Sequence, residues 1–105
     1  MTLITCDTYY DDHILECSGH TGYAKCGDDI LCSAVTMLCI TIASYLEEAA
    51  KKGLIANFLC DISQGYANIR FTSKRGGEAE KCFYALTNGF KILAEAFPDY
   101  ISYEA

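Results

Sequence analysis

Residues 29–53, DILCSAVTMLCITIASYLEEAAKKG, form the segment that decides the fold. The apolar side chains recur every three or four residues, as on one face of an α-helix, at Leu31, Val35, Leu38, Ile42, Tyr45 or Leu46, and Ala49. Asp29 is a good N-cap, and Lys51-Lys52-Gly53 supplies the cations and the glycine that are typical of a helix end. The spacing therefore predicts a long helix between Asp29 and Gly53. Because its circumference is unusually apolar, we expect it to be covered by a sheet and by another helix or a second subunit.

The residues before this helix predict a hairpin and a loop. Residues 3–9 are rich in Thr, Ile, Leu and Tyr, Asp11-Asp12 supplies turn chemistry, and the pattern alternates again from His13 to Cys17. After Ser18, the glycines at positions 19, 22 and 27 break the periodicity. We therefore expect two paired strands followed by a loop of about ten residues, a length at which loops often carry function.

The residues after the helix predict a second hairpin and a second helix. Residues 54–62 and 66–73 read as strands, with a turn at 63–65, and 74–77 form a polar break. Helical spacing then returns up to Pro98, at Phe83, Leu86, Phe90, Leu93 and Phe97. Residues 100–103 have the composition of a short last strand. The order ββαββα(β) predicts an α+β fold, a two-layer sandwich in which two helices cover a mostly antiparallel sheet.

The composition limits the functions that are compatible with the chain. Its 105 residues are 51% hydrophobic with one proline, which suits a single folded domain over residues 1–105. Fourteen acidic and eight basic residues give a net charge of −6, so no positive field attracts nucleic acid or an anionic membrane surface. The stretch from Ile30 to Leu46 lacks charged residues, but it is barely long enough for a membrane span and contains serines and threonines. We therefore expect no direct nucleic-acid partner and no membrane.

The cysteines indicate a reducing compartment. Their number, seven, is odd, no CxxC pair occurs, and no secretory leader precedes them, so a disulfide framework is disfavoured. We therefore expect a cytoplasmic protein in which most thiols are small core residues. The thiols that fit strand or helix patterns in this way are Cys6, Cys39, Cys60 and Cys82.

One group of residues has a definite chemical use. His20 follows a predicted strand, and Cys32 lies at about the third position of the long helix, where unsatisfied N–H groups and the helix dipole favour a thiolate. A histidine in reach of such a thiol can take its proton and later protonate a leaving amine, as in cysteine proteases. Asp29 or Asp28 is a candidate for orienting the imidazole as a third member, but Asp29 cannot readily cap the helix and hold His20 with the same oxygen.

The stretch around these residues resembles a known signature. Residues 19–35, GHTGYAKCGDDILCSAV, are similar to the motif of the ribosomal-processing cysteine proteases, the Prp or YsxB-like family. That motif combines Gly-His, Tyr-Ala, Gly-x-Asp-Ile and a Cys followed by small residues at this spacing. The resemblance covers the whole chain, including the order of elements and the ending Pro98-Asp99-Tyr100-Ile101.

The resemblance implies an activity and a site. It makes Cys32 the nucleophile, His20 its base and Asp29 the acidic residue of the signature, and it implies no cofactor or metal. Residues implied in substrate binding or in the active-site loop are Gly19, Gly22, Tyr23, Gly27, Ser33 and Thr36. Tyr23 is either a lid over the cleft or loop packing, and we expect the loop to close over the cleft when substrate binds. The chain departs from the signature at Cys26, Ser33 and Thr36.

The resemblance also implies partners. It points to a homodimer and to a ribosomal protein precursor as substrate, namely the short, apolar, Phe-rich N-terminal extension of the twenty-seventh protein of the large subunit. Because some family members occur in prophage-like settings, a phage capsid or scaffold protein is the alternative substrate.

Three other interpretations of the same residues remain open. Cys17, His20, Cys26 and Cys32 are ligand types that zinc accepts, although their spacing is irregular. Cys26 and Cys32 are a possible redox pair. A non-catalytic interaction module would leave the thiol of Cys32 with ordinary reactivity.

Overall fold

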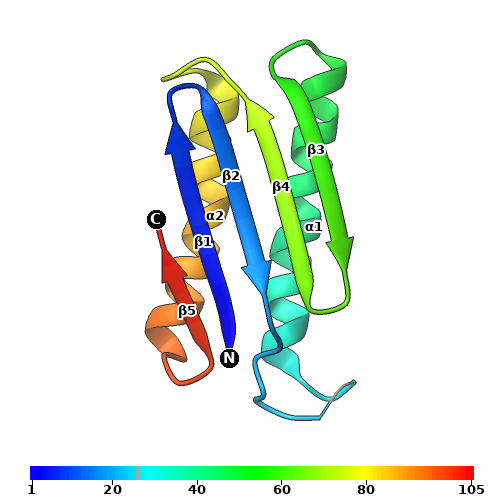
Figure 1. The fold of residues 1–105 in the computed structure, drawn as a ribbon, viewed down its shortest axis with the longest axis vertical. Helices are drawn as coiled ribbons and strands as arrows, with labels where there is room; N and C mark the ends of the chain where they lie inside the picture. The colour runs from blue at the N-terminus through cyan, green and yellow to red at the C-terminus, as the bar shows by residue number, and fades with distance from the viewer. Residues whose placement is uncertain (26) are drawn as a thin grey trace.

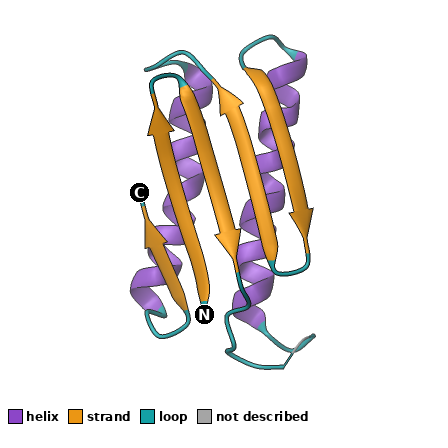
Figure 2. Ribbon diagram, in the orientation of Figure 1, coloured by secondary structure: helices purple, strands orange, loops and turns teal. Residues whose placement is uncertain are grey.

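The computed structural model of the protein describes residues 1–25 and 27–105. Within these residues it contains, in chain order, β1 (Thr2–Tyr9), β2 (Asp12–Ser18), α1 (Ile30–Lys51), β3 (Ala56–Ser63), β4 (Tyr66–Thr72), α2 (Glu78–Ala96) and β5 (Ile101–Glu104). The strands form one sheet in the order β3-β4-β2-β1-β5, in which only β1 and β5 run parallel. Both helices lie on the same face of the sheet (Figure 1, Figure 2). The α+β sandwich and its mostly antiparallel sheet are thus confirmed.

Helix α1 forms as its sequence predicts. The Asp29 side chain accepts a hydrogen bond from the backbone N–H of Cys32 and so caps the helix. At the other end Gly53 has φ +74°, a left-handed conformation that favours glycine after a helix. The predicted spacing is visible in the buried row of α1, which consists of Leu31, Val35, Cys39, Ile42, Leu46 and Ala49.

Helix α1 is covered on two faces, as its apolar circumference predicts. One face packs on the sheet, and another contacts α2, where a side chain at Gly89 would place its Cβ only 2.7 Å from Cδ2 of Leu38. Some apolar residues stay exposed, among them Ile30, Met37 and Ile40. By length and composition alone, α1 is the one helix in the described residues that is long and apolar enough to cross a membrane.

The core fills the space between the sheet and the two helices. Fully buried side chains come from both layers, including Ile4 of β1, Leu15 of β2, Ile69 of β4, Phe83 of α2 and Ile42 of α1. The opposite face of the sheet carries mostly polar residues, such as Glu16 and Asn68, which share a hydrogen bond. The buried hydrophobic residues therefore form one core between the sheet and the helices, on one face of the sheet.

Several details differ from the prediction. The third strand begins at Ala56 rather than residue 54, because the N–H of Leu54 still bonds to the carbonyl of Ala49 at the end of α1. The first hairpin turns at Tyr10 and Asp11, since Asp12 already pairs with Tyr9.

The prediction for the cysteines is partly wrong. Cys6 and Cys39 are buried as expected, and Cys82 is half-buried, but Cys60 is exposed. Cys60 lies on β3, the edge strand of the sheet, so no further strand covers it on one side. Its position at the edge follows from the strand order, which local patterns do not specify.

Candidate active site

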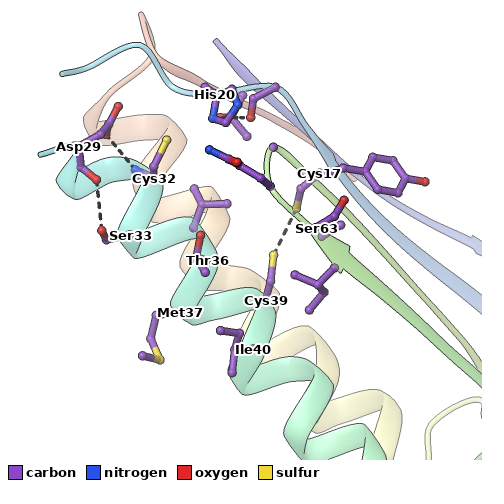
Figure 3. Close-up of a pocket in the computed structure, with 18 of the residues that line it drawn as sticks. Cys17, His20, Asp29, Cys32, Ser33, Thr36, Met37, Cys39, Ile40 and Ser63 are labelled. Atoms are coloured by element: carbon purple, nitrogen blue, oxygen red, sulfur yellow. Dashed lines mark hydrogen bonds between the residues drawn. The ribbon is translucent and has the colours of Figure 1, made fainter. Parts of the chain in front are cut away.

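A cavity of about 660 Å³ lies where the end of β2, the first turns of α1 and the β3–β4 turn meet. Its lining brings together most of the site residues that the sequence singled out, namely Gly19, His20, Gly22, Gly27, Asp29, Cys32, Ser33 and Thr36. Figure 3 shows His20 beside the first turn of α1, with Asp29, Cys32, Ser33 and Thr36 on that helix end. The cavity therefore contains both members of the predicted Cys-His pair.

Cys32 occupies the third position of α1, as its spacing from the cap predicts. The thiol is half-buried, contacts Thr21 and also hydrogen-bonds the Asp29 carboxylate. The backbone N–H of Thr21 donates to Sγ at 3.4 Å, and the Thr21 hydroxyl oxygen lies 3.4 Å from the same sulfur. The sulfur is thus held at the positive end of the helix dipole, which favours an anion.

Asp29 caps the helix and organises the loop before it. Oδ1 accepts the N–H of Cys32 at 2.9 Å. Oδ2 accepts the Thr21 hydroxyl at 2.5 Å and the N–H groups of Tyr23 and Ala24 at 3.1 and 3.3 Å. Burial disfavours the charged carboxylate, but the hydrogen bonds from Thr21, Cys32 and Ala24 outweigh this effect and hold the pKa of Asp29 well below its usual range. Of the two roles predicted for Asp29, capping is the one in place, since none of its hydrogen bonds to described residues goes to His20.

His20 is exposed and rests on the β3–β4 turn. The N–H of Gly19 donates to the carbonyl of Gly65 at 2.9 Å, and this bond ties the end of β2 to that turn. Gly65 has φ +75°, and a Cβ added there would lie 2.9 Å from Nε2 of His20, so the imidazole fills the space that a side chain would take. Among the described residues, no hydrogen bond joins His20 to Cys32. The imidazole has to approach the sulfur before a proton can pass between them.

The loop between β2 and α1 has two anchors, of which only Tyr23 was singled out from the sequence. Thr21 is buried, and the ring of Tyr23 packs edge-on against Tyr100, with 5.3 Å between ring centroids, and against Phe97. Tyr23 is absent from the cavity lining, so its contacts are those of loop packing rather than of a lid. Gly19, Gly22 and Gly27 all have positive φ, as the loop prediction implies. Closure of the loop over substrate stays a prediction.

The cavity walls below Cys32 are apolar. Met37 and Ile40 of α1 and Ile62 of β3 line the cavity and are exposed. Deeper in, the sulfurs of Cys17 and Cys39 lie 3.6 Å apart, and this neighbouring thiol together with burial raises the pKa of Cys17. The arrangement offers a nucleophile at one end and apolar surface along the rest, as a cleft for an apolar peptide requires.

The alternative metal site gains no support from these positions. In the part of the chain that the structure describes, no group of three or more His, Cys, Asp or Glu side chains is placed to hold a metal ion. Cys17 contacts Cys39 rather than Cys32. Cys26, which belongs to both the metal and the redox interpretations, lies outside the described residues.

Thr21 is the site residue that sequence reasoning missed. It follows His20 directly and its hydroxyl bridges Asp29 and Cys32, yet a threonine in a glycine-bearing loop carries no periodic signal. The strongest available clue is its small polar side chain between a predicted base and a predicted cap.

Comparisons with known proteins give the family and the fold of the chain. The sequence profile of the family described as cysteine protease Prp matches residues 3–102. Among solved structures, the chain is similar to SMU.848 from Streptococcus mutans, with 22% identity, a TM-score of 0.68, and 99% of this chain and 92% of that chain covered. No curated protein matches the chain.

Two further similar structures are of the essential ribosomal processing protease Prp from S. aureus. The complex with a covalently linked product peptide has 19% identity and a TM-score of 0.72, and the match covers 99% of this chain and 98% of that chain. The complex with a substrate peptide has 16% identity and a TM-score of 0.68, with both chains fully covered. At these identities the structural likeness concerns the fold, whereas the family profile spans nearly the whole chain, including His20 and Cys32. The protein that places these two residues in one cavity therefore belongs to the Prp family of cysteine proteases.

Proposed function

We propose that the protein is an endopeptidase that removes the short, apolar N-terminal extension of the twenty-seventh protein of the large ribosomal subunit, with Cys32 as nucleophile and His20 as its base. The observation that carries this proposal is the cavity that Cys32, at the N-terminal end of α1, shares with His20 and with apolar walls. The S. aureus relative, a ribosomal processing protease solved with a substrate peptide, supports the choice of substrate class.

In the proposed mechanism His20 acts first as a base and then as an acid, once when the thioester forms and once when it is hydrolysed. His20 takes the proton of the Cys32 thiol, and the thiolate attacks the carbonyl carbon of the scissile peptide bond. The imidazolium then gives that proton to the leaving amine, so the carbon–nitrogen bond breaks and a thioester remains on Cys32. Water, deprotonated by His20, then attacks the thioester, the carbon–sulfur bond breaks, the extension peptide leaves as its carboxylic acid, and the imidazolium returns the proton to the Cys32 thiolate. The N-terminal end of α1 favours the negative charge on sulfur and on the developing oxyanion.

The cavity walls support an apolar substrate. Met37, Ile40 and Ile62 are apolar and exposed, and the cavity is in the size range of a site for several large side chains. Bulky aromatic residues of an extension peptide bury these walls on binding, a gain of roughly 25 cal/mol per Å² of apolar surface. Ser33 and Thr36 line the same cavity and supply polar contacts for the peptide backbone.

The test compares matched cysteine variants. Wild type, Cys32→Ala and Cys60→Ala are each incubated with the precursor protein, and the products are identified by mass spectrometry. Cys60 is the control because it is an exposed thiol on β3 that does not line the cavity. We expect Cys32→Ala to lose at least ~10³-fold in kcat/KM and Cys60→Ala to keep the wild-type value. His20→Asn should lose ~10²-fold or more.

Two outcomes would count against the proposal. Equal cleavage by Cys32→Ala and wild type would remove Cys32 as nucleophile. Cleavage of a phage capsid or scaffold peptide, with the ribosomal precursor left intact, would keep the mechanism and replace the substrate.

We also infer a homodimer in the cytoplasm, without nucleic-acid or membrane partners. The edge strand β3 is largely exposed and carries the exposed Leu59. Ile30 of α1 is exposed as well, so both the sheet and a helix keep uncovered apolar residues. An uncovered edge strand is a site for pairing with another chain. The proposed ribosomal substrate is made in the cytoplasm, the net charge is −6, and the apolar row of α1 is packed on the sheet.

A further inference from the structure

Thr21 occupies an unusual place in the site. Of the described residues between 19 and 28, it alone is buried, with 2% of its surface exposed. Its surroundings are polar, because its hydroxyl lies 2.5 Å from Oδ2 of Asp29 and 3.4 Å from Sγ of Cys32. A threonine buried against a carboxylate and a thiol does more than fill space, since each buried polar atom needs a partner.

The chemistry of its neighbours determines to which of them the Thr21 hydroxyl donates its hydrogen bond. A carboxylate only accepts hydrogen bonds, and the low pKa of Asp29 keeps it ionised, so Thr21 donates to Asp29 while Cys32 is a thiol. The thiol can then donate its own proton to the free lone pair of the Thr21 oxygen. In this state the N–H and the hydroxyl of Thr21 both contact the Cys32 sulfur, which also hydrogen-bonds the Asp29 carboxylate.

The partners change when Cys32 loses its proton. A thiolate cannot donate, and an oxygen lone pair facing it is unfavourable. The hydroxyl can instead turn and donate to sulfur, because Asp29 keeps three backbone donors, the N–H groups of Cys32, Tyr23 and Ala24. The thiolate then has two donors from Thr21, one from the backbone and one from the side chain.

On this geometry, we propose that Thr21 is a positioning residue for the nucleophile, whose hydroxyl moves its hydrogen bond from Asp29 to the Cys32 sulfur as the thiolate forms. The proposal rests on the proposed function only in assigning Cys32 as nucleophile. Thr21 orients the sulfur toward the cavity and stabilises its anionic form, and His20 remains the group that takes the proton.

The experiment measures the reactivity of Cys32 without a substrate. The rate of alkylation of Cys32 by iodoacetamide is followed from pH 5 to 9 by site-resolved mass spectrometry in wild type, Thr21→Val and Thr21→Ser. Valine keeps the shape and removes the hydroxyl, whereas serine keeps the hydroxyl. Cys60, labelled in the same samples, reports any change in the reagent. The other ionisable groups of the cavity, which all variants retain, are Cys17, His20, Asp29, Cys39 and Tyr66.

We expect the pH profile of Thr21→Val to move up by about one pH unit, with about tenfold slower alkylation of Cys32 below neutral pH, because a hydrogen bond to a charged group is lost. Thr21→Ser should follow wild type. With the precursor as substrate, kcat of Thr21→Val should fall by a similar factor while KM stays within about twofold. If valine prevents folding, Thr21→Ala compared with Thr21→Ser makes the same test.

The proposal is overturned if Thr21→Val and wild type have the same profile, or if Thr21→Ser moves as far as Thr21→Val. Failure of the proposed function gives a different result. A wild-type protein that cleaves no precursor, but whose Cys32 profile moves in Thr21→Val, would refute the substrate and leave the role of Thr21 intact.

Discussion

The two histidines have opposite environments, and only one of them suits catalysis. His20 is exposed beside the cavity, whereas His13 on β2 is fully buried at the other end of the sheet. The ring of His13 stacks on Phe71, with 4.7 Å between centroids. Its Nε2 lies 3.3 Å from Oε2 of Glu80, which also pairs with Arg75. The sequence pattern predicts for His13 only a place at the start of a hairpin strand, so its burial is a finding of the structure.

This burial predicts a pH dependence of stability. Burial lowers the pKa of His13, and this effect outweighs the nearby Glu80 carboxylate, so the folded protein favours the neutral imidazole. The stability from this group is present above the unfolded pKa of about 6.5 and is lost as the pH falls below it. Urea unfolding between pH 8 and 5 should show a larger loss of unfolding free energy for wild type than for His13→Gln. A wild type that gains stability relative to His13→Gln at pH 5 would show that the pair with Glu80 dominates.

The chemistry of single residues was predictable where it follows from local spacing. Cys32 falls at the third helical position because Asp29 has the preferred side chain for a cap, and both are neighbours in sequence. Thr21 was not predictable, because its contact with Cys32 depends on the path of a loop with three positive-φ glycines. Local patterns lead to the proposed nucleophile, whereas its contacts with Thr21 depend on tertiary structure.

At the scale of elements, the β3–β4 turn determines where His20, the proposed base, lies. The turn meets the end of β2 through the Gly19–Gly65 hydrogen bond, and the imidazole of His20 lies over Gly65. The proposed catalytic pair is therefore positioned by two neighbouring hairpins and by one helix end. A single methyl group on the turn is expected to displace the base.

The matched variants Gly65→Ala and Gly76→Ala test this arrangement. Both glycines have positive φ, +75° and +77°, so each alanine should cost about 1 kcal/mol of unfolding free energy. Only at Gly65 does the new Cβ meet His20, whereas none of the described atoms lies within 4 Å of a Cβ at Gly76. We expect kcat/KM to fall about tenfold or more in Gly65→Ala and to stay near wild type in Gly76→Ala, since small misplacements of a catalytic group are costly. Equal activity of the two variants would mean that His20 does not need its place on the turn.

The elements themselves were largely predictable, but their order in the sheet was not. Both helices and all the strands were predicted from periodicity and turn residues, with shifts of one or two residues at their ends. The pairing of β2 with β4 and of β1 with β5 joins segments far apart in sequence. Strand pairs of this kind depend on the whole core, and Cys60 was misassigned for that reason, since an edge strand and a central strand have similar local patterns.

At the scale of the whole molecule, the edge of the sheet formed by β3 has no neighbouring strand. Both helices cover the same face of the sheet, and the edge strand β3 flanks α1 (Figure 2). Leu59 on β3 is 66% exposed, and the backbone groups on the outer edge of β3 have no neighbouring strand in the sheet. The same strand contributes Ile62 to the lining of the cavity. A second copy bound here would lie close to the substrate.

The inferred homodimer predicts different effects for two exposed apolar residues. Leu59 lies on β3, and Ile92 lies on α2, which packs behind the other half of the sheet; their exposures, 66% and 58%, are similar. Leu59→Lys places a charge in the inferred interface, where an unpaired charge is expensive to bury, so this variant should become a monomer at micromolar concentration. Ile92→Lys should keep the mass of a dimer, as should wild type. Light scattering coupled to gel filtration measures these masses directly. A wild-type protein that is monomeric throughout would contradict the dimer. Equal dissociation of the two variants would place the interface somewhere other than β3, whose exposed edge would then stay unpaired.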